Sequence, residues 1–188
     1  MAHSGKRRAT YEDLLAVDSR LIAEVLDGEL VTQPRPSSLH ARASSRLGAE
    51  LTGPFDRGRG GPGGWILLDE PELHLHGDVL VPDLAGWTRA RMPELPDAPA
   101  FEIPPDWVCE VLSPSTAATD RAGKLPIYAR ESVRHAWFLD PSARTLEVFR
   151  LEVEGRAWLL AGTWRDEAIV RAEPFEVLEL ELAGLWAK

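Results

Sequence analysis

Apolar residues recur along the chain with two different periods, and each period predicts a different kind of element. A helical period begins after the serine pair at residues 37–38, either of which can cap the helix. The apolar stripe of this helix consists of Leu39, Ala43, Leu47 and Leu51. In this prediction His40 lies off the stripe. A shorter helix is predicted for residues 11–17, because Thr10 can cap its first turn and an acid follows three residues later.

A period of two predicts strands. Residues 21–32 alternate around Asp27-Gly28, a dipeptide that suits a type I′ turn, so we predict a hairpin of residues 23–26 and 29–32. Further strands are predicted for residues 65–68, 72–76, 78–84, 107–113, 135–140 and 145–164. The first three of these runs form either three short strands or one bent strand pair. The last run is a meander with a turn at Glu154-Gly155.

Glycine and proline separate these segments. Residues 53–64 hold six glycines and two prolines and are predicted to be a flexible loop, whereas residues 89–105 hold five prolines and are predicted to be a surface excursion. Helical signals begin at Thr116 or Asp120 and continue past an interruption at Pro126. The order of elements predicts an α/β fold, with a single domain in which helices flank a mixed central β-sheet.

Length, composition and charge limit the classes of protein that remain. With 188 residues and 44% hydrophobic content the chain can bury one core, so we predict a flexible basic N-terminus at residues 1–10 and one domain at residues 11–188. The formal charge of -9 argues against a protein that coats nucleic acid or an anionic membrane. A single cysteine excludes an internal disulfide, and no run is apolar enough to span a membrane. We therefore expect a cytoplasmic protein with no membrane partner.

Two carboxylates interrupt apolar runs and need an explanation. Asp83 follows the apolar residues 80–82, and Glu110 lies within the predicted strand 107–113, on the side opposite Cys109. Removing a carboxylate from water costs several kcal/mol unless a cation or hydrogen bonds compensate. Two converging acids also repel each other, and a divalent cation between them removes the repulsion. The pattern therefore indicates a metal site.

Short motifs cover most of residues 11–151. They are residues 11–15, residues 24–30, Pro82-Asp83, residues 110–116, Asp120-Arg121, Lys124, Tyr128, Trp137 and Asp140-Pro141. Together they resemble the Uma2 family of endonuclease-like proteins, which is grouped with the PD-(D/E)XK nuclease fold of restriction enzymes. The block from Glu110 to Asp140 is the most specific part. The resemblance implies a restriction-endonuclease-like domain.

The resemblance also implies a role for each of four side chains. Asp83 and Glu110 would hold the metal, and Glu24 would be an accessory acid. Lys124 would replace the lysine that the general motif places at the position of Leu112. The implied activity is a Mg²⁺-dependent endonuclease that hydrolyses DNA phosphodiester bonds, with Mn²⁺ as an alternative ion. Such an ion prefers oxygen ligands, stabilises charge on the phosphate and lowers the pKa of its bound water.

Other interpretations of the same residues stay open. Lys124 can form a salt bridge with Asp120 on its own helix, and Glu24 can face solvent from its hairpin. Tyr128 can belong to the core. His40 can lean toward the site or lie on the surface.

The partner follows from weaker signals. Bases outnumber acids within residues 113–135. The bases are Arg121, Lys124, Arg130 and Arg134, and the acids are Asp120 and Glu131. This local excess could contact a DNA backbone. Two subunits whose basic edges line one channel would reach both strands of a DNA duplex, so we expect a homodimer. The alternative is a non-catalytic nucleic-acid-binding or assembly protein that retains the nuclease fold, which the charge of -9 favours.

Overall fold

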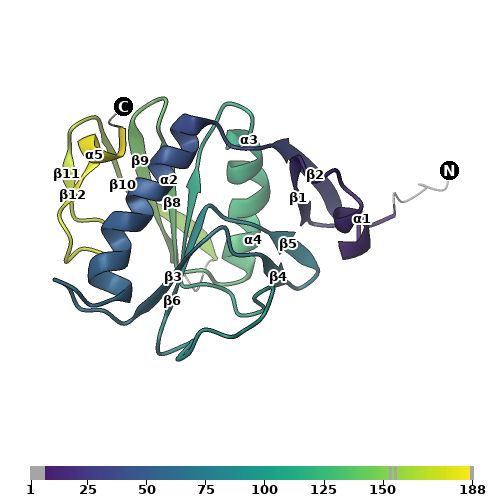
Figure 1. The fold of residues 1–188 in the computed structure, drawn as a ribbon, viewed down its shortest axis with the longest axis horizontal. Helices are drawn as coiled ribbons and strands as arrows, with labels where there is room; N and C mark the ends of the chain where they lie inside the picture. Colours follow the sequence, from purple (N-terminus) through teal and green to yellow (C-terminus); the bar gives the residue numbers. More distant parts are fainter. Residues whose placement is uncertain (1–6, 153, 155, 187–188) are drawn as a thin grey trace.

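The computed structural model describes residues 7–152, 154 and 156–186. It consists of a main sheet with helices on both faces and a second, smaller sheet (Figure 1). The main sheet has the strand order β10-β9-β8-β7-β6-β3. Its strands are β3 (Trp65–Asp69), β6 (Leu84–Thr88), β7 (Trp107–Val111), β8 (His135–Asp140), β9 (Thr145–Glu152) and β10 (Ala157–Arg165). Only β7 and β8 pair in parallel within this described sheet. The mixed α/β arrangement confirms the predicted fold class.

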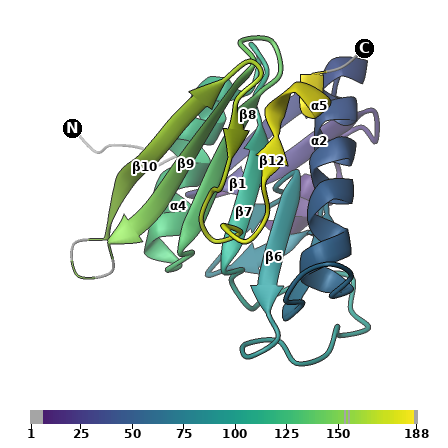
Figure 2. The same ribbon diagram turned by 90° about the vertical axis from the view of Figure 1, so that its left-hand side faces the viewer.

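Helices cover both faces of the main sheet (Figure 2). They are α1 (Tyr11–Leu15), α2 (Ser38–Leu51), α3 (Ala117–Thr119), α4 (Leu125–Arg130) and α5 (Leu182–Trp186), with the π-helical turns η1 (Thr52–Asp56) and η2 (Asp120–Lys124). The segment α3-η2-α4 is the crossover that a parallel strand pair needs. The short strands β11 (Ile169–Val170) and β12 (Leu180–Glu181) pair with each other beside α5.

Strand β7 separates the two parts of the core. Cys109 and Val111 pack with α2 and α5 on one face, whereas Val108 packs with residues of α4 on the other. This follows from the two-residue period of a strand. Glu110 therefore projects toward the α4 side, and this is opposite Cys109 as predicted.

The small sheet has the order β2-β1-β5-β4 and consists of β1 (Leu21–Leu26), β2 (Glu29–Pro34), β4 (Leu73–Leu75) and β5 (Asp78–Leu80). Its hairpin turns at Asp27 and Gly28, whose φ angles of 51° and 81° are both positive, as a type I′ turn requires. The predicted hairpin is confirmed. The run predicted over residues 78–84 breaks after Leu80, because β5 pairs with β1 and β4 whereas β6 pairs with β3 and β7. Residues 81–83 therefore cross from one sheet to the other.

The prediction of a flexible loop over residues 53–64 is wrong in its first part. Helix α2 continues into η1, where Phe55 is 2% exposed and packs against Phe175 with ring centroids 4.6 Å apart. Burial of this large ring stabilises the turn despite the glycine and proline within it. The remainder of the segment has no helix or strand.

The described part of the N-terminal segment contacts the hairpin. The Ala9 N–H donates to the Gly28 carbonyl oxygen at 2.8 Å, and Thr10 forms the predicted capping box with Asp13. Residues 1–6 of the predicted flexible N-terminus, and Gly155 of the predicted turn, lie outside the described residues. No helix in the described ranges is long and apolar enough to cross a membrane.

Candidate active site

A cavity of about 290 Å³ opens where the small sheet meets the main sheet. Asp83 reaches it from the segment between β5 and β6, and Glu110 reaches it from β7. Asp120 and Lys124 line it from η2. Elements that are distant in the sequence thus bring the carboxylates of Asp83, Glu110 and Asp120 and the ammonium group of Lys124 to one cavity.

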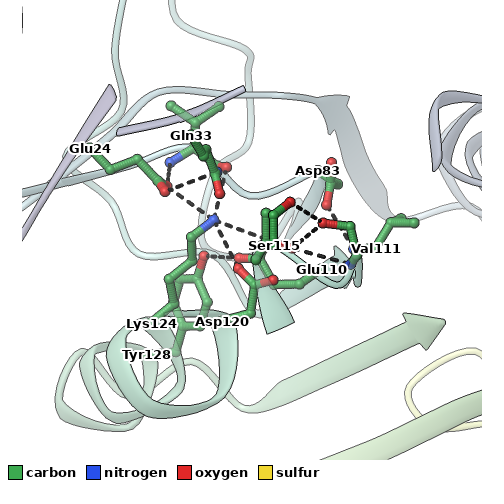
Figure 3. Close-up of polar contacts among 12 residues, drawn as sticks. Glu24, Gln33, Asp83, Glu110, Val111, Ser115, Asp120, Lys124 and Tyr128 are labelled. Atoms are coloured by element: carbon green, nitrogen blue, oxygen red, sulfur yellow. Dashed lines mark hydrogen bonds and ion pairs between the residues drawn. The ribbon is translucent and has the colours of Figure 1, made fainter. Parts of the chain in front are cut away.

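Lys124 is the centre of the polar contacts around this cavity (Figure 3). Its Nζ atom lies 3.0 Å from Glu24 Oε1 and 3.1 Å from Glu110 Oε2. The nearest oxygen of Asp120 is 3.5 Å away, four residues back on the same helical segment. With 1% of Lys124 exposed, the ammonium group has carboxylates in place of water.

The choice of lysine at this position is informative. The chain has 21 lysines and arginines, of which only Lys6, Lys124 and Lys188 are lysines. An ammonium group is a compact point charge, whereas a guanidinium group is broad and planar, so lysine fits between several carboxylates. Burial lowers the pKa of Lys124, but the negative charges of Glu110, Glu24 and Asp120 raise it well above the ordinary value of 10.5. The direction of this shift favours the protonated, cationic form of Lys124 at neutral pH.

Glu110 is held at both of its oxygens. Oε2 contacts Lys124, and Oε1 accepts a hydrogen bond of 2.6 Å from the Tyr128 hydroxyl. Burial raises the pKa of Glu110 well above 4.5, and the charges of Asp120 and Asp83 raise it further, although Lys124 opposes them. Carboxylates outnumber the one ammonium group in this cluster. An additional cation near Glu110 would therefore stabilise its charged form.

Asp83 is held separately from Glu110. Its Oδ2 accepts from the Val111 N–H at 2.7 Å, and its Oδ1 lies 2.5 Å from His40 Nε2. Figure 3 shows the Asp83 carboxylate above the Val111 amide, whereas the contacts of Glu110 are with Lys124 and Tyr128. The two acids line one cavity but have different hydrogen-bond partners.

The donor set suits a hard divalent ion. In the described part of the chain no three His, Cys, Asp or Glu side chains are grouped closely enough to hold a metal by themselves. Mg²⁺ does not need such a cage, because it keeps several waters and is commonly bound by one or two carboxylates. Asp83 and Glu110 supply two carboxylates on one cavity, and the excess of acid favours a cation there. The residues present therefore fit Mg²⁺ or Mn²⁺.

The structure brings together the four side chains predicted from the sequence. Asp83, Glu110 and Lys124 line the cavity, and Glu24 contacts Lys124 from β1. Glu24 is 1% exposed, so the alternative of a solvent-facing hairpin residue is wrong. The predicted salt bridge between Lys124 and Asp120 is present as well, together with the contacts to the other acids.

His40 and Tyr128 are more involved than the sequence indicated. The buried stripe of α2 is His40, Ala43, Leu47 and Leu51. Placing His40 off the stripe was wrong, because Leu39 is 39% exposed and His40 is 7% exposed. The spacing of three residues to Ala43 was the signal that could have identified it. Tyr128 is buried as predicted, and its hydroxyl also contacts Glu110; no local pattern indicates that contact.

The basic residues predicted to contact DNA are largely paired with acids. Arg121 lies 2.5 Å from Glu147, and Arg130 contacts Asp27, Asp78 and Glu131. Lys124 is buried. Acids therefore neutralise Arg121, Lys124 and Arg130, whereas the exposed Arg134 takes no part in these ion pairs.

The fold and the site define a mixed α/β protein with a cavity lined by acidic side chains between its two sheets. The Uma2 family model, described as "Putative restriction endonuclease", matches residues 8–184, so the chain belongs to the Uma2 family. The structure is similar to that of "a putative nuclease belonging to DUF820 from Anabaena variabilis ATCC 29413", with a TM-score of 0.76 and 21% sequence identity. That match covers 95% of this chain and 97% of the other, and at this identity it shows the fold alone. A search of curated proteins found no match.

Proposed function

We propose that this protein is a Mg²⁺-dependent endonuclease that hydrolyses DNA phosphodiester bonds in the cytoplasm. The observation that carries the proposal is the buried Lys124 within 3.1 Å of Glu110, on a cavity that Asp83 also lines. Burying an ammonium group and several carboxylates together costs free energy of folding unless their geometry is well matched. Clusters of buried ionisable groups are common at functional sites, so a catalytic function would explain why this costly cluster is present.

The proposed chemistry divides between the ion and the protein. A divalent ion held by Asp83 and Glu110, Mg²⁺ or alternatively Mn²⁺, would polarise the phosphate and lower the pKa of a bound water. Lys124 stabilises the additional negative charge of the transition state, since its raised pKa makes it a cation rather than a base. His40 and the Val111 N–H orient Asp83, while Tyr128 and Lys124 orient Glu110.

A plasmid assay tests this proposal. Supercoiled plasmid is incubated with Mg²⁺ and wild-type protein, Asp83→Asn or Glu110→Gln, with an EDTA control for each. Asp97→Asn, in the exposed excursion, is the matched acid-to-amide control. We expect cleavage by the wild type and by Asp97→Asn, and a loss of about 100-fold or more in the two site variants. Equal cleavage by all four proteins would identify a contaminating nuclease and refute the proposal.

We also propose that the protein cuts duplex DNA as a homodimer. One chain carries one Asp83–Glu110–Lys124 set, and cutting both strands in one encounter requires two. Sedimentation velocity over a range of concentrations tests the dimer. A monomer at all concentrations that still converts plasmid directly to the linear form would contradict it.

The competing function is that of a non-catalytic assembly or nucleic-acid-binding protein that retains the nuclease fold. The charge of -9 and the ion pairs of Arg121 and Arg130 leave little free positive charge for a polyanion, which favours the assembly role over cleavage of DNA. DNA binding that depends on Mg²⁺, without cleavage over long incubation, would support this second function.

A further inference from the structure

Two residues lining the cavity are a lysine and an arginine, and they differ in what surrounds them. They are Lys124 and Arg35. Lys124 is buried and its charge faces three carboxylates. Arg35 is exposed and lies in the connection between β2 and α2. One cation thus belongs to the cluster, and the other lies where the cavity meets solvent.

The guanidinium of Arg35 has no carboxylate partner among the described residues. Its neighbours along the chain are Pro34 and Pro36, and one of its terminal nitrogens donates to the carbonyl oxygen of Ser19 at 2.9 Å. A carbonyl oxygen does not neutralise the positive charge. Several N–H groups of a guanidinium can still bind an anion when one of them is occupied. Arg35 therefore differs from Arg121 and Arg130, whose charges are paired.

Hydroxyl groups also line this cavity. They belong to Ser113, Ser115 and Thr116, in the connection between β7 and α3. The Ser113 hydroxyl oxygen lies 2.9 Å from that of Ser115 and 3.1 Å from that of Thr116. Hydroxyls rotate to suit a partner and can donate to phosphate oxygens. They add neutral donors to a cavity that is otherwise rich in carboxylates.

We propose that Arg35, together with the hydroxyls of Ser113, Ser115 and Thr116, forms a phosphodiester-binding subsite at the cavity. The ligand of this subsite would be the sugar-phosphate backbone of a nucleic acid, and this part of the proposal rests on the proposed function. A backbone that approaches Asp83 and Glu110 is repelled by them, and the guanidinium offsets this repulsion. Guanidinium groups bind phosphate through two parallel N–H bonds, which also fixes the direction of the backbone.

Fluorescence anisotropy with a short labelled DNA duplex measures the contribution of Arg35. Binding is followed in EDTA and in Ca²⁺ over a series of salt concentrations, for wild type, Arg35→Ala and Arg35→Lys. The control is Arg165→Ala. Arg165 lies at the end of β10, and its side chain is 81% exposed. The same measurement with an RNA duplex of the same sequence shows whether the subsite binds the backbone of DNA, of RNA or of both.

We expect Arg35→Ala to weaken binding about tenfold and to reduce the slope of log affinity against log salt by about 1. Arg35→Lys keeps the slope but binds less tightly than wild type, because lysine cannot make two parallel bonds. Arg165→Ala matches the wild type. Wild-type affinity and slope in Arg35→Ala would overturn the subsite, and so would a wild-type protein that binds neither duplex.

A structural role of Arg35 gives a different result. If the guanidinium only ties its segment to Ser19, Arg35→Ala lowers the thermal unfolding temperature but leaves the salt slope unchanged, which overturns the subsite. The subsite and the proposed function fail separately. Plasmid cleavage with an unchanged slope in Arg35→Ala refutes only the subsite. Binding that depends on Arg35, without cleavage by wild type, refutes only the nuclease and supports the subsite.

Discussion

His40 Nε2 lies 2.5 Å from Asp83 Oδ1, and the imidazole thereby fixes one oxygen of a carboxylate whose other oxygen is bound by the Val111 N–H. The two supports come from α2 and β7, on either side of the segment that carries Asp83. Residues 81–83 have no regular structure. The geometry of Asp83 therefore depends on its two partners more than on its own backbone.

Substitution of His40 should weaken metal binding without removing a proposed ligand. We expect His40→Ala to lower Mg²⁺ affinity by about 10- to 100-fold, as is typical when the hydrogen-bond partner of a ligating carboxylate is lost. His40→Gln retains an N–H donor and should lose less. Calorimetric titration with Mg²⁺ and electron paramagnetic resonance with Mn²⁺ measure affinity independently of cleavage. Identical affinities in wild type and His40→Ala would show that His40 does not position Asp83.

Lys124 should resist chemical modification in the folded protein. Its raised pKa keeps the amine protonated at pH 8 to 9, and its 1% exposure excludes reagents. Reductive methylation followed by mass spectrometry should leave Lys124 unmodified in the native protein and modify it fully in urea. Rapid methylation of Lys124 in the native state would mean that the cluster opens or that the amine is neutral.

Asp120 should make the stability of the protein depend on pH in a defined direction. Burial raises the pKa of Asp120 above its ordinary value of 3.8, although Lys124 opposes the shift. The folded state therefore binds a proton more tightly than the unfolded state, so this group's contribution to stability is greatest below pH 3.8 and falls as the pH rises through the folded-state pKa. Asp120→Asn lacks this titration.

Urea unfolding of wild type and Asp120→Asn at pH 4 and pH 7 measures this effect. The free energy of unfolding of the wild type, relative to that of Asp120→Asn, should be lower at pH 7 than at pH 4. A constant difference between the two proteins would show that Asp120 titrates normally. A difference of opposite sign would mean that Lys124 stabilises the charged form more than burial opposes it.

Sequence alone located most of the proposed site because its acids violate local patterns. Asp83 and Glu110 stand out as charges at apolar positions, and the Asp27-Gly28 turn fixes the register of the strand that carries Glu24. Lys124 followed from the family resemblance. The signals for Asp83, Glu110 and the hairpin turn are each contained in a few neighbouring residues, whereas the signal for Lys124 is the wider resemblance.

The remaining features depend on contacts between distant residues. The run 78–84 carries one continuous apolar signal, yet it divides between two sheets because its halves have different pairing partners. Phe55 extends a helix into a glycine-rich segment because Phe175, far along the chain, covers it. The ion pairs that neutralise Arg121 and Arg130 likewise join separate elements. No local period encodes such pairings.

Glu24 allows a test of whether an accessory acid acts on the ion or on the protein. Glu24 Oε1 accepts from the Val81 N–H at 2.8 Å and lies 3.0 Å from Lys124 Nζ. Val81 is two residues before Asp83, so Glu24 supports the segment that carries the proposed ligand. We expect Glu24→Gln to keep an acceptor for Val81 and to change stability by less than about 1 kcal/mol, because Lys124 retains Glu110 and Asp120.

Glu24→Ala should cost about 1–3 kcal/mol, since it leaves the partly buried Val81 N–H without its acceptor. Urea unfolding measures both changes, and calorimetric titration with Mg²⁺ separates the two roles. If Glu24 supports the protein alone, Glu24→Gln binds Mg²⁺ as tightly as wild type, whereas Asp83→Asn binds it weakly. Equal losses of affinity in Glu24→Gln and Asp83→Asn would instead make Glu24 a direct ligand of the ion.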